Sequence, residues 1–390
     1  MCIAYQYPNA YPSYEMPTKD LHAKPFDDAT KGKLRIFQEY LRVWLPTFVM
    51  GTRKRLCIVD FFAGTGYDES RCQGSPINTL EVVKQYSEML FKRGVRIELH
   101  LNEFNKKKYN LLKRSCTEYI QQHEQLTRLI DLNYYNLDFE VAFDQLINRI
   151  EKFPALVYLD QNGIKFLTRG RLMALEASRQ TDFLYFVSSS YLKRFGQTEQ
   201  FQRYLPVDTA KIKDVDYNLI HEHLLDQIKY LLPSNTALRL YPFSIKKGPN
   251  IYGIVFGAQS PRAVEKFLTL AWKENALNGS ANFDIEEDDF QGSQMSLFAA
   301  PKITKLRKFE IALEKFVLTN MPVLNSTLYL WTLERGHTPS QALAVLKKMK
   351  KNNKIVYNGR SPKIKYSSLR KEADQVMITN TNTDEKEQQN

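Results

Sequence analysis

The stretch of the chain with the clearest chemical potential runs from Arg55 to Gly66, with the sequence RLCIVDFFAGTG. An apolar run ends at Asp60 and is followed by Gly64 and Gly66, a pattern typical of a buried parallel strand whose carboxyl end meets a ligand. Glycine allows a sharp turn and a close approach of the backbone, and its exposed amide can donate to an anionic group. Many strand-to-helix turns of α/β proteins share this pattern, so its meaning depends on the acids that follow later strands.

Acidic residues close several of the later strands that the sequence predicts. The expected strands after the first cover residues 96–103, 126–132, 155–160 and 183–188, and helical patterns lie between them. Glu103 and Asp160 end their strands, and Asp138 follows the third one. Alternating strands and helices predict a doubly wound α/β sheet, whose ligands bind along the carboxyl edge. The acids should therefore lie along one edge of the sheet.

The end of this region distinguishes two versions of the doubly wound fold. Residues 237–244 and 251–256 flank a turn and predict an antiparallel hairpin. Such a hairpin, closing a mainly parallel sheet, separates the class I methyltransferases from plain dinucleotide-binding proteins. The expected fold is therefore the Rossmann-like class I methyltransferase fold, a doubly wound, mostly parallel sheet with a closing antiparallel hairpin.

The cofactor of such a fold is S-adenosylmethionine, and the strand ends indicate where it would bind. The glycine turn would lie under the methionine part, and Glu103 would accept hydrogen bonds from both ribose hydroxyls. Asp138 would lie near the adenine amino group, and Asp160 would face the methyl acceptor. Each acid alone could be a solvated residue at a strand end, and their order along the chain favours the cofactor. The candidate cofactor-binding residues are Asp60, Phe62, Ala63, Gly64, Gly66, Glu103 and Asp138.

Composition limits the classes of protein to which the chain can belong. With 390 residues, 43% of them hydrophobic and 25% charged, it has the composition of a soluble protein of two or three domains. It lacks the run of about 18 uncharged apolar residues that a membrane span requires, and its first residues do not resemble a signal peptide. Four cysteines without metal-like spacing predict a reduced, cytoplasmic setting and no metal site.

The net charge of +12 is concentrated near the C-terminus. Residues 301–371 contain 16 Lys and Arg against 3 Asp and Glu, so the rest of the chain is close to neutral. Three helical patterns followed by strands at 354–357 and 363–366 predict a winged helix. The alternative is a solvated charged surface, but because few acids offset these cations we expect contacts with DNA or RNA. The candidate nucleic-acid-binding residues are Lys347, Lys348, Lys350, Lys351, Arg360, Lys363 and Lys365.

These patterns divide the chain into five parts. They are an N-terminal arm (1–30), a methyltransferase-like domain (31–275), an acidic linker (276–300), a basic winged helix (301–370) and a disordered tail (371–390). A helical pattern that begins at Thr30 should end near Pro46, since proline disrupts a helix interior. In the linker, Gln294–Phe298 resembles the short peptide with which bacterial DNA enzymes dock on the replication sliding clamp.

Several motifs of the chain resemble one known family, the three-Cys-motif partner proteins, which are methyltransferase-like proteins of bacteria and phages. The similarity covers residues 30–275 and is carried by Leu34, Tyr40–Trp44, Ile58–Tyr67, Gly74–Pro76 and Leu159–Gly163. The resemblance implies a partner that is similar to radical S-adenosylmethionine proteins and has three cluster cysteines. A basic winged helix also recurs among these relatives.

One motif departs from the family pattern and bears on catalysis. Relatives tend to have Asp-Pro-Phe-Gly where this chain has Asp160-Gln-Asn-Gly163. DNA enzymes that methylate amines carry Asp/Asn-Pro-Pro-Tyr there, and they hold the target amine with the carboxylate and a proline carbonyl while the base is flipped out. Here Asp160 and Asn162 are the candidate catalytic residues, with Phe166 or Tyr67 to stack on a base. Because no cysteine lies near the fourth strand, attack on cytosine C5 is disfavoured.

Two functions from different classes fit this sequence. The first is an S-adenosylmethionine-dependent, methyltransferase-like protein that acts on or with nucleic acid and is tethered by its winged helix. The alternative is a non-catalytic nucleic-acid-binding adaptor that partners a radical-S-adenosylmethionine-like or defence-system enzyme, and the altered motif at Asp160 keeps it open. A nuclease is less favoured because no Glu-x-Lys follows a strand-end Asp at a suitable spacing.

Overall fold

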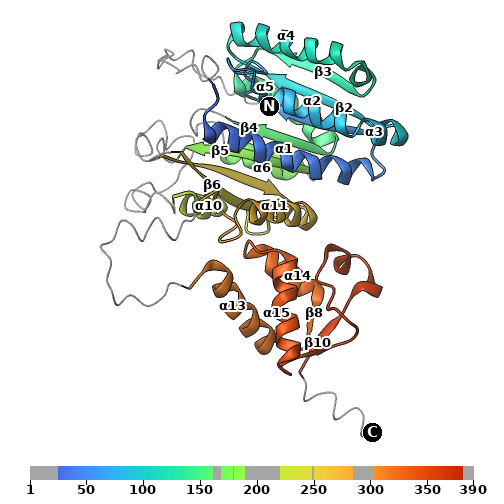
Figure 1. Cartoon of the computed structure of the whole chain (residues 1–390), viewed down its shortest axis with the longest axis vertical. Coiled ribbons are helices and arrows are strands. Elements are labelled where there is room, and N and C mark those ends of the chain that lie inside the picture. The colour runs from blue at the N-terminus through green and yellow to red at the C-terminus, as the bar shows by residue number, and fades with distance from the viewer. Residues whose placement is uncertain are drawn as a thin grey trace, which may run out of the picture.

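The computed structural model (Figure 1) describes residues 25–160, 168–178, 180–188, 220–247, 250–283 and 303–380. The arm up to residue 24, most of the acidic linker with Gln294–Phe298, and the candidate residues Asn162 and Phe166 lie outside these ranges. The described residues form a seven-stranded sheet covered by helices and a smaller C-terminal module. None of the helices in these ranges is both long and apolar enough to cross a membrane.

The larger unit is built on one sheet with the strand order β3-β2-β1-β4-β5-β7-β6. Its strands are β1 (Arg55–Asp60), β2 (Arg96–Asn102), β3 (Ile130–Tyr135), β4 (Ala155–Leu159), β5 (Thr181–Ser188), β6 (Arg239–Lys247) and β7 (Asn250–Ala258). The first five run parallel, and β7 runs antiparallel to both of its neighbours, β5 and β6. The predicted doubly wound, mostly parallel sheet with a closing hairpin is confirmed.

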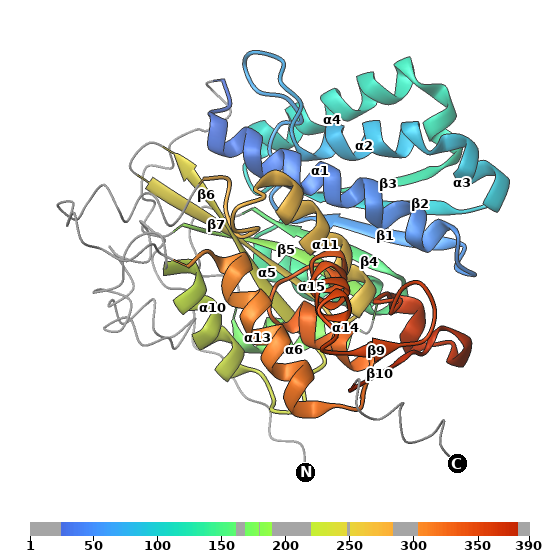
Figure 2. The same cartoon turned by 60° about the horizontal axis from the view of Figure 1, so that its bottom comes forward.

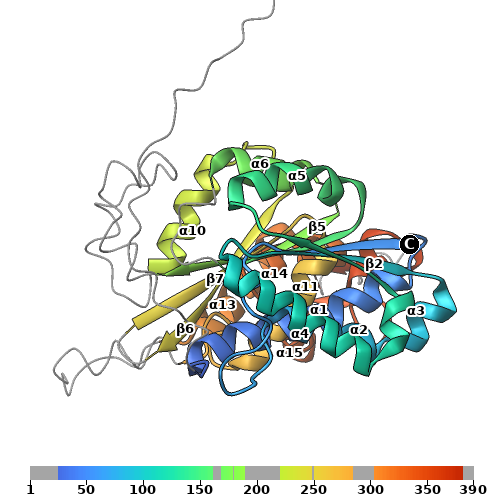
Figure 3. The same ribbon diagram turned by 90° about the horizontal axis from the view of Figure 1, so that it is seen from above.

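Helices cover both faces of this sheet, as the view from above shows (Figure 3). One face carries α1 (Asp28–Val49), α2 (Ser75–Gln85), α3 (Ser87–Arg93), α4 (Lys106–Gln122) and α11 (Pro261–Glu274), and the other carries α5 (Phe139–Lys152), α6 (Arg169–Ala177) and α10 (Ile220–Leu231). Two separate clusters of buried apolar side chains fill the two layers. Because β1 pairs in parallel with both β2 and β4, the residues after these strands, among them Glu103 and Asp160, meet at the edge where Asp60 lies.

Helix α1 is longer than the sequence predicts, because it passes through Pro46 and ends at Val49. A proline inside a helix removes one N–H and leaves the carbonyl four residues earlier without its usual donor. That carbonyl belongs to Arg42, and it accepts a hydrogen bond of 3.0 Å from the Tyr86 hydroxyl. A side chain from the neighbouring helix pair thus replaces the missing donor, which a local sequence rule does not anticipate.

The C-terminal module combines helices with a small antiparallel sheet of order β8-β10-β9. Its elements are α13 (Lys305–Asn320), β8 (Val323–Leu324), α14 (Asn325–Glu334), α15 (Pro339–Lys351), β9 (Val356–Tyr357) and β10 (Met377–Thr379), with short 3-10 turns at Tyr366–Leu369 and Glu372–Asp374. The three helices that the sequence predicts before the strands are present as α13, α14 and α15. The first predicted strand corresponds to β9.

The second predicted strand, at 363–366, is wrong. Lys363 has a φ of 49°, in the left-handed region, which interrupts an extended backbone. The strand that pairs with β9 is β10, inside the segment expected to be a tail. Residues up to 380 belong to the module because Ile378 is fully buried and the Asn325 side chain binds the Asp374 carbonyl and the Val376 amide.

The module packs directly against the β6 and α11 side of the sheet domain (Figure 1). The Tyr241 hydroxyl donates to the Leu333 carbonyl at 2.8 Å, and the Trp272 indole donates to the Gly336 carbonyl at 2.9 Å. The Tyr329 hydroxyl donates to Glu265 at 2.7 Å. These contacts hold the end of α14 against the sheet domain, so the module is docked rather than joined only through its linker.

Candidate functional site

Asp60 ends β1 as a buried carboxyl group, with 2% of its surface exposed. One oxygen accepts from the Phe62 amide at 3.0 Å, and the other accepts from the Ser75 hydroxyl at 2.6 Å. Burial raises the pKa of Asp60 to about 7; the two hydrogen bonds counter part of this increase, and the nearby charges of Asp160 and Glu103 add to it. Among the residues that the structure describes, no basic side chain forms an ion pair with Asp60.

Glu103, immediately after β2, contacts the glycine turn directly. Its carboxylate accepts from the Gly64 amide at 3.1 Å and from the Asn105 amide at 2.8 Å. Gly64 has a φ of 66°, a conformation that glycine adopts without strain. The glycine turn and the second-strand acid therefore lie together, as the sequence predicts.

Gly66 has a structural reason to be glycine. Its φ is 87°, and a Cβ added there would lie 2.9 Å from the Ser115 Cβ on α4. The Ser115 hydroxyl donates to the Thr65 carbonyl at 2.9 Å, which fixes the turn against that helix. The close approach of α4 therefore requires glycine at this position independently of any ligand.

The buried residue Asn102 organises the carboxyl edge and was not singled out by the sequence. Its amide group donates to the carbonyls of Phe61 at 3.2 Å and Leu137 at 3.1 Å, and its side-chain oxygen accepts from the Leu137 amide at 3.2 Å. Its backbone carbonyl accepts from the Ala63 amide at 2.9 Å. One side chain thus ties together the ends of β1, β2 and β3. An asparagine at the last position of an apolar alternating strand is the signal that could have identified it.

Asp138 lies beside this junction but has a structural task of its own. It is exposed and caps α5, since its carboxylate accepts from the Glu140 amide at 2.8 Å. The ring of Phe62 stacks on Phe139, the first residue of α5, at a centroid distance of 5.3 Å. The cap uses one carboxylate oxygen, and no described residue forms a hydrogen bond with the other.

Asp160, which follows β4, is bound by Lys33, a residue that sequence analysis missed. The Lys33 ammonium lies 2.7 and 2.8 Å from the two carboxylate oxygens and 3.8 Å from the centre of the Phe186 ring. The Tyr158 hydroxyl lies 3.4 Å from the same carboxylate. Lys33 occupies a buried position on the same stripe of α1 as Phe37. A lysine on the apolar face of an amphipathic helix is the signal that would have identified it.

The loop between the glycine turn and α2 is fixed to the segment before α1. The Asp68 carboxylate is buried and accepts from the Phe26 amide at 2.6 Å and from the Cys72 amide at 2.7 Å. Tyr67 and Gln73 form an isolated antiparallel bridge across this loop. The loop therefore joins the beginning of α1 to the carboxyl edge and brings Lys33 close to Asp160.

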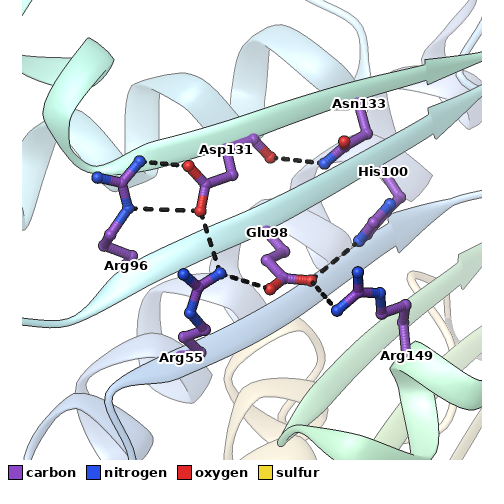
Figure 4. Close-up of polar contacts among 7 residues, drawn as sticks. All are labelled: Arg55, Arg96, Glu98, His100, Asp131, Asn133 and Arg149. Carbon is purple, nitrogen blue, oxygen red and sulfur yellow. Dashed lines mark hydrogen bonds and ion pairs between the residues drawn. The ribbon is translucent and has the colours of Figure 1, made fainter.

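A second set of acidic residues, Glu98 and Asp131, lies in the amino-terminal halves of β2 and β3 (Figure 4). Glu98 is 4% exposed, lies 2.8 Å from Arg55 and 3.8 Å from Arg149, and faces His100 at 3.6 Å. Asp131 on β3 forms ion pairs with Arg55 and Arg96. Here every carboxylate is matched by an arginine of the protein itself.

The structure separates the seven predicted nucleic-acid-binding residues into two groups. Lys347, Lys348, Lys351 and Arg360 are exposed, and no described carboxylate pairs with them. The remaining three residues contact their own module. Lys350 donates to the Tyr357 carbonyl at 3.0 Å, and Lys363 and Lys365 lie 3.5 and 3.2 Å from Asp374.

No family model matches the sequence, and no curated protein matches it. Among solved structures, the chain is similar to Trm1 from Pyrococcus horikoshii in complex with S-adenosyl-L-methionine, with 13% identity and a TM-score of 0.34 over 62% of this chain and 59% of that chain. It is similar to DszA carbon methyltransferase, with 14% identity and a TM-score of 0.35 over 60% of this chain and 55% of that chain. The chain thus spans less than two thirds of either structure, and likeness at these scores establishes neither fold nor function.

Proposed function

We propose that this protein binds S-adenosylmethionine at the carboxyl edge of its sheet and acts as a methyltransferase-like protein on or with nucleic acid. The observation that carries the proposal is Asp60, a buried carboxyl group beside the glycine turn that lacks a described basic partner. A buried charge needs compensation, and a ligand with an ammonium and a sulfonium group would supply it. The strand order, with antiparallel β7 between β5 and β6, is the order expected for a class I methyltransferase.

The residues at this edge fit such a ligand in distinct ways. Glu103 would accept hydrogen bonds from the ribose hydroxyls, because a carboxylate has about four acceptor positions and can accept from several donors at once, as it does from the amides of Gly64 and Asn105. The glycine turn would let the backbone approach the methionine part closely. Bound S-adenosylmethionine supplies an activated methyl group, so the protein chiefly needs to orient the reacting groups.

Calorimetry with S-adenosylmethionine and S-adenosylhomocysteine tests the cofactor site. A cation beside Asp60 favours its ionised form, so binding should release a proton and the affinity should rise as the pH increases through about 7. Asp60→Asn should weaken the binding of S-adenosylmethionine by about tenfold, or roughly 1.4 kcal/mol. It should weaken the binding of S-adenosylhomocysteine by less, because the sulfur of that ligand is uncharged.

Two further variants complete this experiment. Glu103→Gln should weaken both ligands, since each of them carries the ribose. The control Asp131→Asn removes a carboxylate at the other end of β3 and should leave both affinities unchanged. Absence of binding by the wild-type protein between pH 6 and pH 9 would contradict the proposal.

The contact between Lys33 and Asp160 supports a second candidate function, the non-catalytic adaptor. Both Asp160 oxygens accept hydrogen bonds from the ammonium of Lys33, so the carboxylate is less available for a target amine.

Transfer of a labelled methyl group to DNA, RNA and co-purifying protein decides between the two functions. An enzyme should label one acceptor and lose this activity in Asp160→Ala, whereas an adaptor should bind the cofactor without labelling any acceptor. Co-purification from the native host tests the partner with three cluster cysteines that the family resemblance implies.

We propose in addition that the C-terminal module is a winged helix that binds nucleic acid through α15. The exposed Lys347, Lys348 and Lys351 lie on one face of this helix, and Arg360 follows β9.

The salt dependence of DNA binding tests this proposal. If these four residues contact phosphates, the slope of log affinity against log salt concentration should be roughly −3 to −4 for duplex DNA. Replacing Lys347, Lys348 and Lys351 by Gln should flatten this slope by about 3. Replacing Lys363 and Lys365, which pair with Asp374, should change it less.

A further inference from the structure

A cavity of about 510 Å³ lies between the sheet domain and the C-terminal module, and none of its lining residues belongs to the proposed cofactor site. Its walls come from α10, the outer edge of β6 and Leu268 of α11 on one side, and from Lys305 of α13 and the turn 334–336 on the other. Figure 2 shows α10 of the sheet domain and α13 of the module at this junction. Small-molecule sites commonly occupy cavities of about 300–1,000 Å³ at domain interfaces, so the volume is suitable for a ligand.

The floor of the cavity is apolar. Five leucines line it, and each is less than one tenth exposed: Leu225, Leu232, Leu238, Leu240 and Leu268. Tyr241 also lines the cavity, and its hydroxyl donates to the Leu333 carbonyl, so its polar end is directed at the module. A ligand with an apolar body would therefore bury its surface here without displacing a hydrogen bond.

The rim of the cavity is basic. Four basic side chains line it against two acidic ones, and these are Lys229, Arg239, Lys305, Arg335, Asp226 and Glu334. Lys229 pairs with Asp226 at 3.4 Å. Arg239 donates only to the carbonyls of Ala237 and Gln259, and Arg335 lies over the Trp331 ring at 3.6 Å, with no described carboxylate paired to either guanidinium. Arg239 and Arg335 therefore favour a negatively charged group at the mouth of the cavity.

The edge of β6 adds one backbone donor. Ser244 directs its amide away from β7, because this amide donates to the Ser280 carbonyl at 2.7 Å. Backbone direction repeats every two residues along a strand, so Pro242 and Leu240 face the same side, where they line the cavity. Proline has no N–H, which leaves the Leu240 amide as a single donor. One donor is too few for an added peptide strand and suits a compact ligand.

We infer that this cavity binds a compact amphipathic organic anion, with its apolar body on the leucine floor and its carboxylate, sulfonate or phosphate group at Arg335 and Arg239. Such a ligand contacts the sheet domain and the basic module at once and strengthens their association. The inference is independent of the proposed cofactor site, because the two share no residue.

Two fluorescent probes test this site in the full-length protein. They are 8-anilinonaphthalene-1-sulfonate and N-phenyl-1-naphthylamine, which has nearly the same aromatic body without the sulfonate. We expect saturable binding of the anionic probe at one site, and at least tenfold weaker binding of the neutral probe. Non-saturable fluorescence, or equal affinity for both probes, would overturn the inference. Saturating S-adenosylhomocysteine should not displace the anionic probe, and displacement would place that probe in the cofactor site instead.

Charge-reversal variants locate the anion. Arg335→Glu should weaken the binding of the anionic probe at least tenfold and change the affinity for the neutral probe by less than twofold. The matched control Lys308→Glu also reverses a positive charge, but on the exposed surface of α13 outside the cavity. It should leave the affinity for both probes unchanged. Circular dichroism verifies that each variant folds. If Arg335→Glu does not fold, Arg335→Gln is used in its place. Equal losses in the Arg335 variant and the control would contradict a specific site.

Discussion

The neighbouring strands β1 and β2 carry buried acids at opposite ends, and the surroundings of the two acids differ. In the amino-terminal half, Glu98 is buried between Arg55 and Arg149 (Figure 4). At the carboxyl edge, Asp60 is equally buried but is held by a backbone amide and the Ser75 hydroxyl. The protein neutralises the first group with its own arginines, whereas no described basic side chain forms an ion pair with the second. A buried acid therefore indicates function only when its partners are known.

The largest effect that would test this comparison concerns Asp60 and pH. Its pKa is raised from 3.8 to about 7 in the folded protein, so its contribution to stability is complete below pH 4 and is lost as the pH rises through 7. The loss amounts to about 4 kcal/mol by linkage. Asp60→Asn removes it, and the free energy of unfolding of this variant should fall less between pH 4 and pH 8 than that of the wild-type protein.

Urea denaturation of both proteins without ligand measures this difference. Asp182, buried against the Tyr40 hydroxyl, also has a pKa raised by burial to about 7, but it is present in both proteins and cancels. Parallel curves for the wild-type protein and Asp60→Asn would show that Asp60 is as well compensated as Glu98.

A smaller effect is expected when Lys33, the cation that pairs with Asp160 at the carboxyl edge, is removed. The side chains are 9% and 18% exposed, so Lys33→Met leaves a largely buried carboxylate without its partner. We expect the free energy of unfolding at pH 7 to fall by about 3 kcal/mol. The control Lys31→Met, on exposed surface of the same helix, should change it by less than about 0.5 kcal/mol. The double variant Lys33→Met/Asp160→Leu should recover most of the loss, and failure to do so would indicate a packing role for Lys33.

The smallest effect is expected in the amino-terminal group. Glu98→Gln removes the carboxylate between Arg55 and Arg149, whose side chains are about half exposed and can be solvated by water. A loss of about 1–3 kcal/mol in the free energy of unfolding should result, with no change in the affinity for S-adenosylmethionine. Thermal unfolding and calorimetry measure the two quantities. Weaker binding of S-adenosylmethionine by this variant would show that the two ends of the strands are coupled, which would contradict the contrast drawn between Glu98 and Asp60.

The chain order of strands and acids was sufficient to predict the sheet and the edge at which Asp60, Glu103 and Asp160 lie. Apolar runs ending in Asp60, Glu103 and Asp160 are local signals, and parallel strands align their carboxyl ends whatever their loops contain. The glycine turn was likewise predicted, whereas its hydrogen bond to the second-strand acid Glu103 was seen only in the structure.

Local patterns failed where a distant residue decides the outcome. Helix α1 passes Pro46 because Tyr86 supplies a donor from another helix, and the strand expected at 363–366 is replaced by β10, which lies about ten residues further on. Alternation of polar and apolar residues near Lys363 resembles a strand, but the left-handed backbone there prevents one.

The sequence by itself determined the order of elements, the acids and glycines at the strand ends, and the concentration of positive charge in the last module. Only the tertiary structure decided which of these charges are compensated. Lys33 reaches Asp160 across 127 residues, Arg55 and Arg149 enclose Glu98, and Asp374 binds two of the expected nucleic-acid-binding lysines. Compensation depends on distances of a few ångströms between side chains that are remote in the chain, and such distances exist only once the sheet and its helices have packed.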